Sequence, residues 1–170
     1  MGATVSADQR GFSLIETMIA LGILAIVAAG VLPLGIIAAK STENHGHLNA
    51  RTTEYAQDKI EQLMALAYGD ASTDTRVFPA VPTGGSGLTV GGSVNTAAPA
   101  ALYVDYLDEK GNLSNAAANW YYMRAWQINQ SGGRANLKQI TVIARVNALS
   151  LGGPGLVPQS TVSVLKTFPF

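Results

Sequence analysis

The feature that most constrains this chain is an uncharged apolar segment near its N-terminus. The 23 residues from Thr17 to Ala39 include no charged side chain and are rich in Ile, Leu, Val and Ala. At about 1.5 Å of rise per residue, such a helix is long enough to cross a hydrocarbon core about 30 Å thick. We therefore expect a transmembrane helix over residues 12–39.

A single carboxylate, Glu16, lies at the start of this apolar segment. A carboxylate at the centre of a membrane costs about 2.5–3.5 kcal/mol on insertion scales, and less near the interface, so a cationic partner is expected. No basic residue lies between Glu16 and Lys40. The α-amino group that cleavage between Gly11 and Phe12 would create is the simplest partner.

Residues Arg10–Ala39 resemble the N-terminal signature of the type IV pilin family, in which a short leader ends in glycine. Here Gly11 is followed by Phe12-Ser13-Leu14-Ile15-Glu16-Thr17-Met18 and then by the apolar helix. The resemblance implies that a prepilin peptidase cleaves after Gly11 and methylates the new amine of Phe12. It also implies an assembly role for Glu16, through the amine of a neighbouring subunit, and a helix kink at Pro33.

Two ordinary interpretations compete with this one. A secretory signal peptide has a basic start, a shorter apolar run and a small-residue cleavage site, and Val27-Ala28-Ala29 could serve as that site. Against it, Glu16 interrupts the start of the run, and Arg10 is balanced by Asp8 in the leader. A plain single-span anchor is the other alternative, but it leaves Glu16 without a purpose.

The composition leaves room for one membrane helix and one small domain, because the chain has 170 residues, 48% of them hydrophobic and 13% charged. It has no cysteine, so the domain must fold without a disulfide. No histidine follows His47 and no carboxylate follows Glu109, so no catalytic constellation assembles. His45 and His47, two apart on a helix, point to different faces. We expect no enzyme activity, no cofactor and no metal site.

Charge is unevenly distributed along the chain. Residues 1–109 carry a net charge of −6 and residues 110–170 carry +6. This asymmetry favours docking of a basic sheet on an acidic helix or on a neighbouring subunit. A basic face for nucleic acid is the alternative, although the six basic residues are spread along the chain. They are Lys110, Arg124, Arg134, Lys138, Arg145 and Lys166.

After the apolar segment, residues 40–68 have the period of an amphipathic helix that ends near Gly69 and Asp70. Residues 69–101 are rich in Gly, Pro, Ser and Thr, and predict a connecting loop with a short strand at Leu88–Val90. The glycines lack the lysine and the strand-to-helix context of a phosphate-binding loop. The apolar stripe of the helix comprises Leu48, Tyr55, Ile60, Leu63, Met64 and Ala67.

Residues 102–170 contain four strand candidates joined by short turns, which predicts an antiparallel meander lying against the second half of the helix. In the second candidate, Trp120, Tyr122, Trp126 and Ile128 are expected on one face. The fold class is therefore α+β, with a long N-terminal helix packed on a small antiparallel sheet, as in the pilin fold. The candidates are Leu102–Leu107, Trp120–Ile128, Leu137–Ala148 and Thr161–Phe168.

With residues 1–11 as the leader, the resemblance implies a structural minor subunit of a bacterial type IV pilus or type II secretion pseudopilus. The stretch Tyr55–Leu63 is most similar to V-type minor pilins and I-type minor pseudopilins. The implied partners are other pilin or pseudopilin subunits, the prepilin peptidase and an assembly platform in the inner membrane. The chain would span that membrane once, with its C-terminal domain outside the cytoplasm, before entering the fibre. A DNA-binding minor pilin and a membrane-anchored domain that never polymerises are the alternatives.

Overall fold

The computed structural model describes residues 13–114, 120–133, 135–151 and 156–168, and every structural statement below refers to these. Gly11 and Phe12 lie outside them. The chain divides into two compact units, Met1–Asn44 and His45–Phe170. In order, the elements are α1 (Leu14–Ala65), β1 (Gly91–Gly92), β2 (Val104–Leu107), β3 (Tyr122–Gln130), the 3-10 turn η1 (Ser131–Gly133), β4 (Leu137–Val146), the 3-10 turn η2 (Ala148–Leu151) and β5 (Gln159–Thr167).

The second unit is built on an antiparallel sheet of five strands. β3, β4 and β5 are successive neighbours, with Ile128 opposite Ile140 and Ile140 opposite Val164. β1 and β2 both pair with the other edge of β3, β2 with its first half and β1 further along. The predicted antiparallel meander is thus confirmed for β2 to β5, and the α+β class with it.

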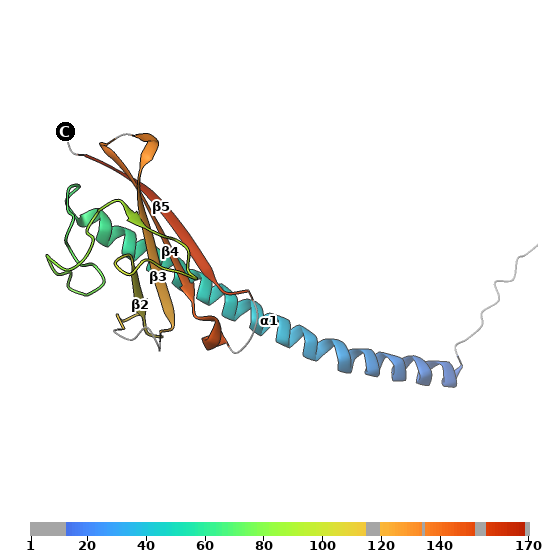
Figure 1. Ribbon diagram of the computed structural model, residues 1–170. Coiled ribbons are helices and arrows are strands. Elements are labelled where there is room, and N and C mark those ends of the chain that lie inside the picture. The colour runs from blue at the N-terminus through green and yellow to red at the C-terminus, as the bar shows by residue number, and fades with distance from the viewer. Residues whose placement is uncertain (1–12, 115–119, 134, 152–155, 169–170) are drawn as a thin grey trace, which may run out of the picture. The chain divides into compact units, whose positions relative to one another are not determined.

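The later part of α1 packs along one face of this sheet (Figure 1). Its buried positions recur at intervals of three and four, which is the spacing of one helix face. Ala67, which was expected on this face, is exposed because α1 ends at Ala65 and the chain has already left the helix. The buried positions are Thr52, Tyr55, Ala56, Lys59, Ile60 and Leu63.

Two further expectations are wrong. Trp120 does not share a face with Tyr122, because β3 begins only at Tyr122 and the alternation of a strand does not extend back to it. Its ring packs against Tyr106, 5.8 Å away between centroids, on the other side of the sheet. The short strand expected at Leu88–Val90 lies instead at Gly91–Gly92.

The loop after α1 is organised by Asp70. Its Oδ1 accepts hydrogen bonds from the backbone N–H groups of Ser72 and Thr73, and its backbone oxygen accepts one from Leu88. Gly87 lies against Asp70 with a φ of 50°, and a Cβ there would come within 2.2 Å of its carboxylate. The glycines therefore permit close backbone packing in this loop.

Two lysines from the sheet bind backbone oxygens at the C-terminal end of α1 and in the loop that follows it. Lys166 donates hydrogen bonds from Nζ to the carbonyl oxygens of Met64 and Leu66, at 2.5 and 2.6 Å. Lys138 donates in the same way to Tyr68 and Leu88, both at 2.8 Å. The last carbonyls of a helix lack partners within the helix and carry its negative dipole end, so the ammonium group of Lys166 stabilises this terminus. Lys138 instead joins two parts of the loop that follows the helix.

Candidate functional site

The described part of the first unit is a helical segment whose apolar side chains are exposed. Fourteen large apolar residues between Leu14 and Ile37 have exposures from 52% at Val27 to 78% at Leu14. They lie on all sides of the helix, and fully burying one such side chain contributes about 1.5–3 kcal/mol. A surface of this kind requires either lipid or other helices around it. Among the described helices, α1 is long and apolar enough to cross a membrane.

Glu16 lies in the first turn of α1, where Ser13 begins the helix. The backbone N–H of Glu16 donates to Ser13 Oγ at 3.3 Å. A serine followed three residues later by glutamate is the capping-box arrangement, and a carboxylate also interacts favourably with the positive end of the helix dipole. Glu16 is exposed. Its carboxylate is therefore accessible to a cation from outside the chain.

Pro33 lies inside α1, so the element continues through this residue, and the kink expected there remains a prediction. His45 and His47 are exposed helix residues. Among the described residues, no group of three or more His, Cys, Asp or Glu side chains could hold a metal ion.

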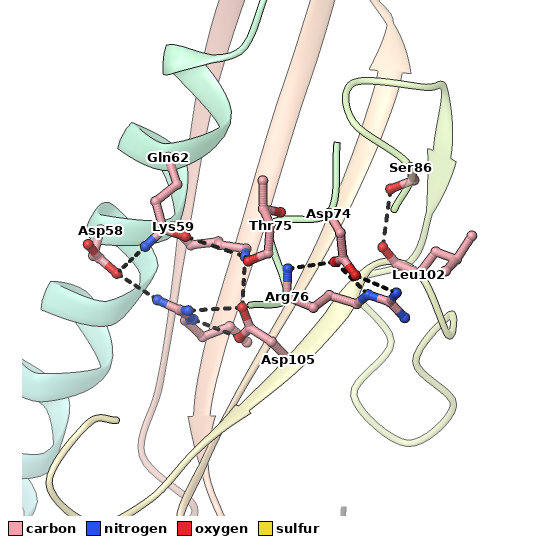
Figure 2. A network of polar contacts seen from close by, with 10 residues as sticks. Asp58, Lys59, Gln62, Asp74, Thr75, Arg76, Ser86, Leu102 and Asp105 are labelled. Atoms are coloured by element: carbon pink, nitrogen blue, oxygen red, sulfur yellow. Dashed lines mark hydrogen bonds and ion pairs between the residues drawn. The ribbon is translucent and has the colours of Figure 1, made fainter. Parts of the chain in front are cut away.

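A second polar arrangement, which the sequence analysis did not predict, lies between α1 and the sheet. Lys59 is fully buried, and its Nζ donates to Asp105 Oδ2 at 2.7 Å and to the carbonyl oxygen of Thr75 at 2.6 Å (Figure 2). The same ammonium lies 4.2 Å from the centroid of the Trp126 ring. The helix, a strand and the loop after the helix therefore meet at one side chain.

Arg124 extends this arrangement into a charged network. Its Nε and Nη2 donate to the two carboxylate oxygens of Asp105, at 2.7 and 2.9 Å, and its Nη1 donates to Asp58 at 2.7 Å. Asp105 and Arg124 are each 2% exposed at the side chain, whereas Asp58 is 53% exposed. Two cations and two carboxylates balance, as a buried network requires. We call these four residues, Asp58, Lys59, Asp105 and Arg124, the charged network.

Burial lowers the pKa of Lys59 to about 8, even though the adjacent Asp105 carboxylate favours its charged form. A lysine with a lowered pKa is a candidate nucleophile when a substrate is able to reach it. Here Nζ is enclosed, and it already donates to Asp105 and Thr75. The contacts of Lys59 therefore fix the helix on the sheet.

The basic half of the chain is largely committed to internal contacts. Arg124 belongs to the charged network, Lys166 binds the end of α1, Lys138 binds the loop after it, and Arg145 donates to Thr96 at 2.8 Å. Arg134 lies outside the described residues. Of the other five, only Lys110 has an exposed side chain without such a role, so these residues form no continuous basic face.

Comparison with known families agrees with the N-terminal features. The family model of the prokaryotic N-terminal methylation motif matches residues 6–32. No curated protein matches the chain. No solved structure matches it either. The matched motif is the type IV prepilin-like signature, and it supports a pilin-like subunit processed by prepilin peptidase, in a family that is structural rather than catalytic.

Proposed function

We propose that this chain, which carries the type IV prepilin-like signature, is a minor structural subunit of a type IV pilus or of a type II secretion pseudopilus. The observation that carries this proposal is the first part of α1. It presents apolar side chains on every side and a single carboxylate in its first turn. Lipid satisfies such a surface before assembly, and the helices of other subunits satisfy it in a fibre.

In this proposal the chain is held in the inner membrane by residues 12–39, with residues 40–170 on the extracytoplasmic side. Prepilin peptidase removes residues 1–11 and methylates Phe12. The charged network and Lys166 at the end of α1 keep the later helix fixed to the sheet, so that the folded unit follows the helix into the fibre. The partners are other pilin subunits and the assembly platform.

The N-terminus of the mature protein tests this proposal. Intact-mass analysis of the protein purified from membranes should give a chain that starts at Phe12 and carries one methyl group. A start at Gly30 would indicate an ordinary signal peptidase acting after Val27-Ala28-Ala29, and an uncut chain would indicate a plain anchor. Either mass contradicts the proposal.

A matched pair of glycine substitutions sharpens the experiment. Gly11→Phe should leave the full-length precursor in the inner membrane, because the residue before the cut must fit the peptidase. Gly22→Ala is the control, since no atom outside its own helix lies within 4 Å of the position where a Cβ would be added. Normal processing of Gly11→Phe would contradict cleavage at this site.

DNA uptake, the alternative of a different class, has less support. Binding through phosphates would require clustered cations. Four of the five described basic residues of the C-terminal half, Arg124, Lys138, Arg145 and Lys166, instead make contacts inside the second unit. Absence of salt-dependent DNA binding by the purified protein is the expected result.

A further inference from the structure

We propose that the second unit rests on the lipid surface through two exposed leucines, Leu149 and Leu156, on either side of the β4–β5 connection. Their exposures, 89% and 90%, exceed those of all other large apolar side chains in the part of the chain that the structure describes. No charged residue occurs from Ala148 to Pro158. This inference rests on the membrane-spanning part of the proposed function.

The two leucines lie at the end of the second unit where the chain enters from the apolar segment. At this end of the sheet, Ser160 Oγ lies 2.9 Å from the hydroxyl of Thr52 and 2.8 Å from that of Thr53. Leu156 lines a shallow hollow together with His45, the first residue of the unit. The start of β5 is therefore held beside the first turns of helix in this unit.

The length of the intervening chain brings this end close to the membrane. Lys40 is the first charged residue after the apolar run, and His45 follows five residues later. Five residues span about 7.5 Å as a helix and at most about 18 Å when extended. The headgroup region on each side of the hydrocarbon core is about 5–7 Å thick. A side chain next to His45 therefore lies within reach of the interface.

The chemistry around the leucines fits the neutral part of a lipid surface. Leu149 lines a second hollow with Trp120 and Tyr121, and rings of these two types are enriched at membrane–water interfaces. Asp108 and Glu109 also line that hollow, and no described residue that lines either hollow is a Lys or an Arg. Attraction to anionic headgroups is therefore not the driving force. Contact should persist on neutral phosphatidylcholine vesicles and at high salt.

The absence of cysteine makes a direct test feasible. Single-cysteine variants of the full chain at Leu149, Leu156, Leu165 and Ile26 are labelled with an environment-sensitive fluorophore and reconstituted at low density in phosphatidylcholine vesicles. Leu165, on β5 and 54% exposed, is the matched control outside the connection, and Ile26 reports on the spanning segment. Quenching is measured with nitroxide lipids of defined depth and with aqueous iodide.

The expected result is a blue shift at Leu149 and Leu156, with loss of fluorescence to shallow nitroxides and protection from iodide. Leu165 should be quenched by iodide, and Ile26 by deep nitroxides. If Ile26 behaves as expected while Leu149 and Leu156 behave like Leu165, the inference is overturned and the proposed function stands. If Ile26 is not quenched by deep nitroxides, the spanning segment and the inference fail together. At low density no second copy covers the leucines, so a surface reserved for a neighbouring subunit would give iodide quenching.

Discussion

Lys59 Nζ lies 2.7 Å from Asp105 Oδ2, and the two side chains are 0% and 2% exposed. This pair joins α1 to β2. Arg124 binds both oxygens of the same carboxylate, so one anion serves two buried cations. Asp105 is thus the member of the charged network that pairs with both cations, and its loss removes the carboxylate that Lys59 contacts.

Asp105→Asn should lower the free energy of unfolding by about 3–5 kcal/mol, the range typical of removing one partner from a buried ion pair. The amide keeps the size of the side chain but leaves the two buried cations, Lys59 and Arg124, with only the exposed carboxylate of Asp58 to balance them. Urea unfolding of the full chain in detergent, followed by the fluorescence of buried Trp126, measures the change. A loss within the usual range of surface substitutions would contradict this view of Asp105.

Lys59→Met should cost much less than Asp105→Asn. Arg124 still pairs with Asp105 in this variant, the methionine fills a similar volume, and a buried ammonium no longer needs to be desolvated. The same urea experiment compares the two variants directly. Equal losses would mean that Lys59, and not only Asp105, is essential to the charged network.

Stability should rise with pH through the titration of Lys59. Burial lowers its pKa from the ordinary 10.5 to about 8 in the folded protein. Between these values the unfolded chain binds the proton that the folded chain has lost, so raising the pH favours folding, and the gain disappears as the pH falls through about 8. From pH 7 to pH 9.5, the urea midpoint of the natural protein should therefore rise relative to that of Lys59→Met. A difference that does not change with pH would contradict the titration.

Lys166→Met should cost about 1–2 kcal/mol, because two carbonyls at the end of α1 lose a charged donor. Hydrogen exchange should increase in the last turn of the helix and much less near Thr52. Lys166→Arg restores a cation and should recover part of the loss, while Lys110→Met, at an exposed turn, is the control. Unchanged exchange in the last turn would show that the lysine does not stabilise it.

Two substitutions of Glu16 distinguish three possible roles of this residue: pairing between subunits, helix capping and recognition by the peptidase. Glu16→Gln keeps the length and capping ability of the side chain, whereas Glu16→Leu removes both, and neither carries charge. If the carboxylate pairs with the amine of Phe12 on a neighbouring subunit, both variants are cut normally but enter fibres poorly. The measurement is the ratio of variant to major subunit in purified fibres, with Thr17→Ala as control.

Other outcomes of the Glu16 experiment exclude that role. If both variants are present at the natural ratio, the carboxylate does not set the register between subunits. Normal incorporation of Glu16→Gln with poor incorporation of Glu16→Leu would assign Glu16 to helix capping. Failure of cleavage in both would assign it to recognition by the peptidase.

Much of the fold was predictable from local patterns. Runs of aromatic and β-branched residues between turn sequences located β2 to β5 to within about two residues, because such side chains favour strands and Gly, Asn and Asp interrupt them. The boundary errors at Trp120 and Ala67 share one cause. The spacing of apolar residues in the sequence continues past the residue at which the backbone hydrogen bonds of the helix or strand end. The sequence pattern therefore overstates the length of the element.

The charged network was not predicted, because the buried stripe of a helix is recognised in a sequence by its apolar residues. Lys59 is four residues after Tyr55 and four before Leu63, in the centre of the buried face. Arg124 likewise lies between Tyr122 and Trp126 on one face of β3. A cation at a core position on each element is a signal in the sequence, and it implies a buried anion. Which carboxylate supplies it depends on the pairing of β2 with β3, which no local pattern specifies.

β5 is attached to the helix near both of its own ends, by Ser160 at Thr52 and Thr53 and by Lys166 at Met64 and Leu66. From Thr52 to Met64 the helix rises about 18 Å, and from Ser160 to Lys166 the strand advances about 20 Å, so the two run alongside each other with matched spacing. A pulling force along the helix axis would load both attachments together, in shear. The two attachments would have to break together rather than one after the other. A unit attached in this way would therefore resist unfolding by a pull on its helix more strongly than one attached at a single end.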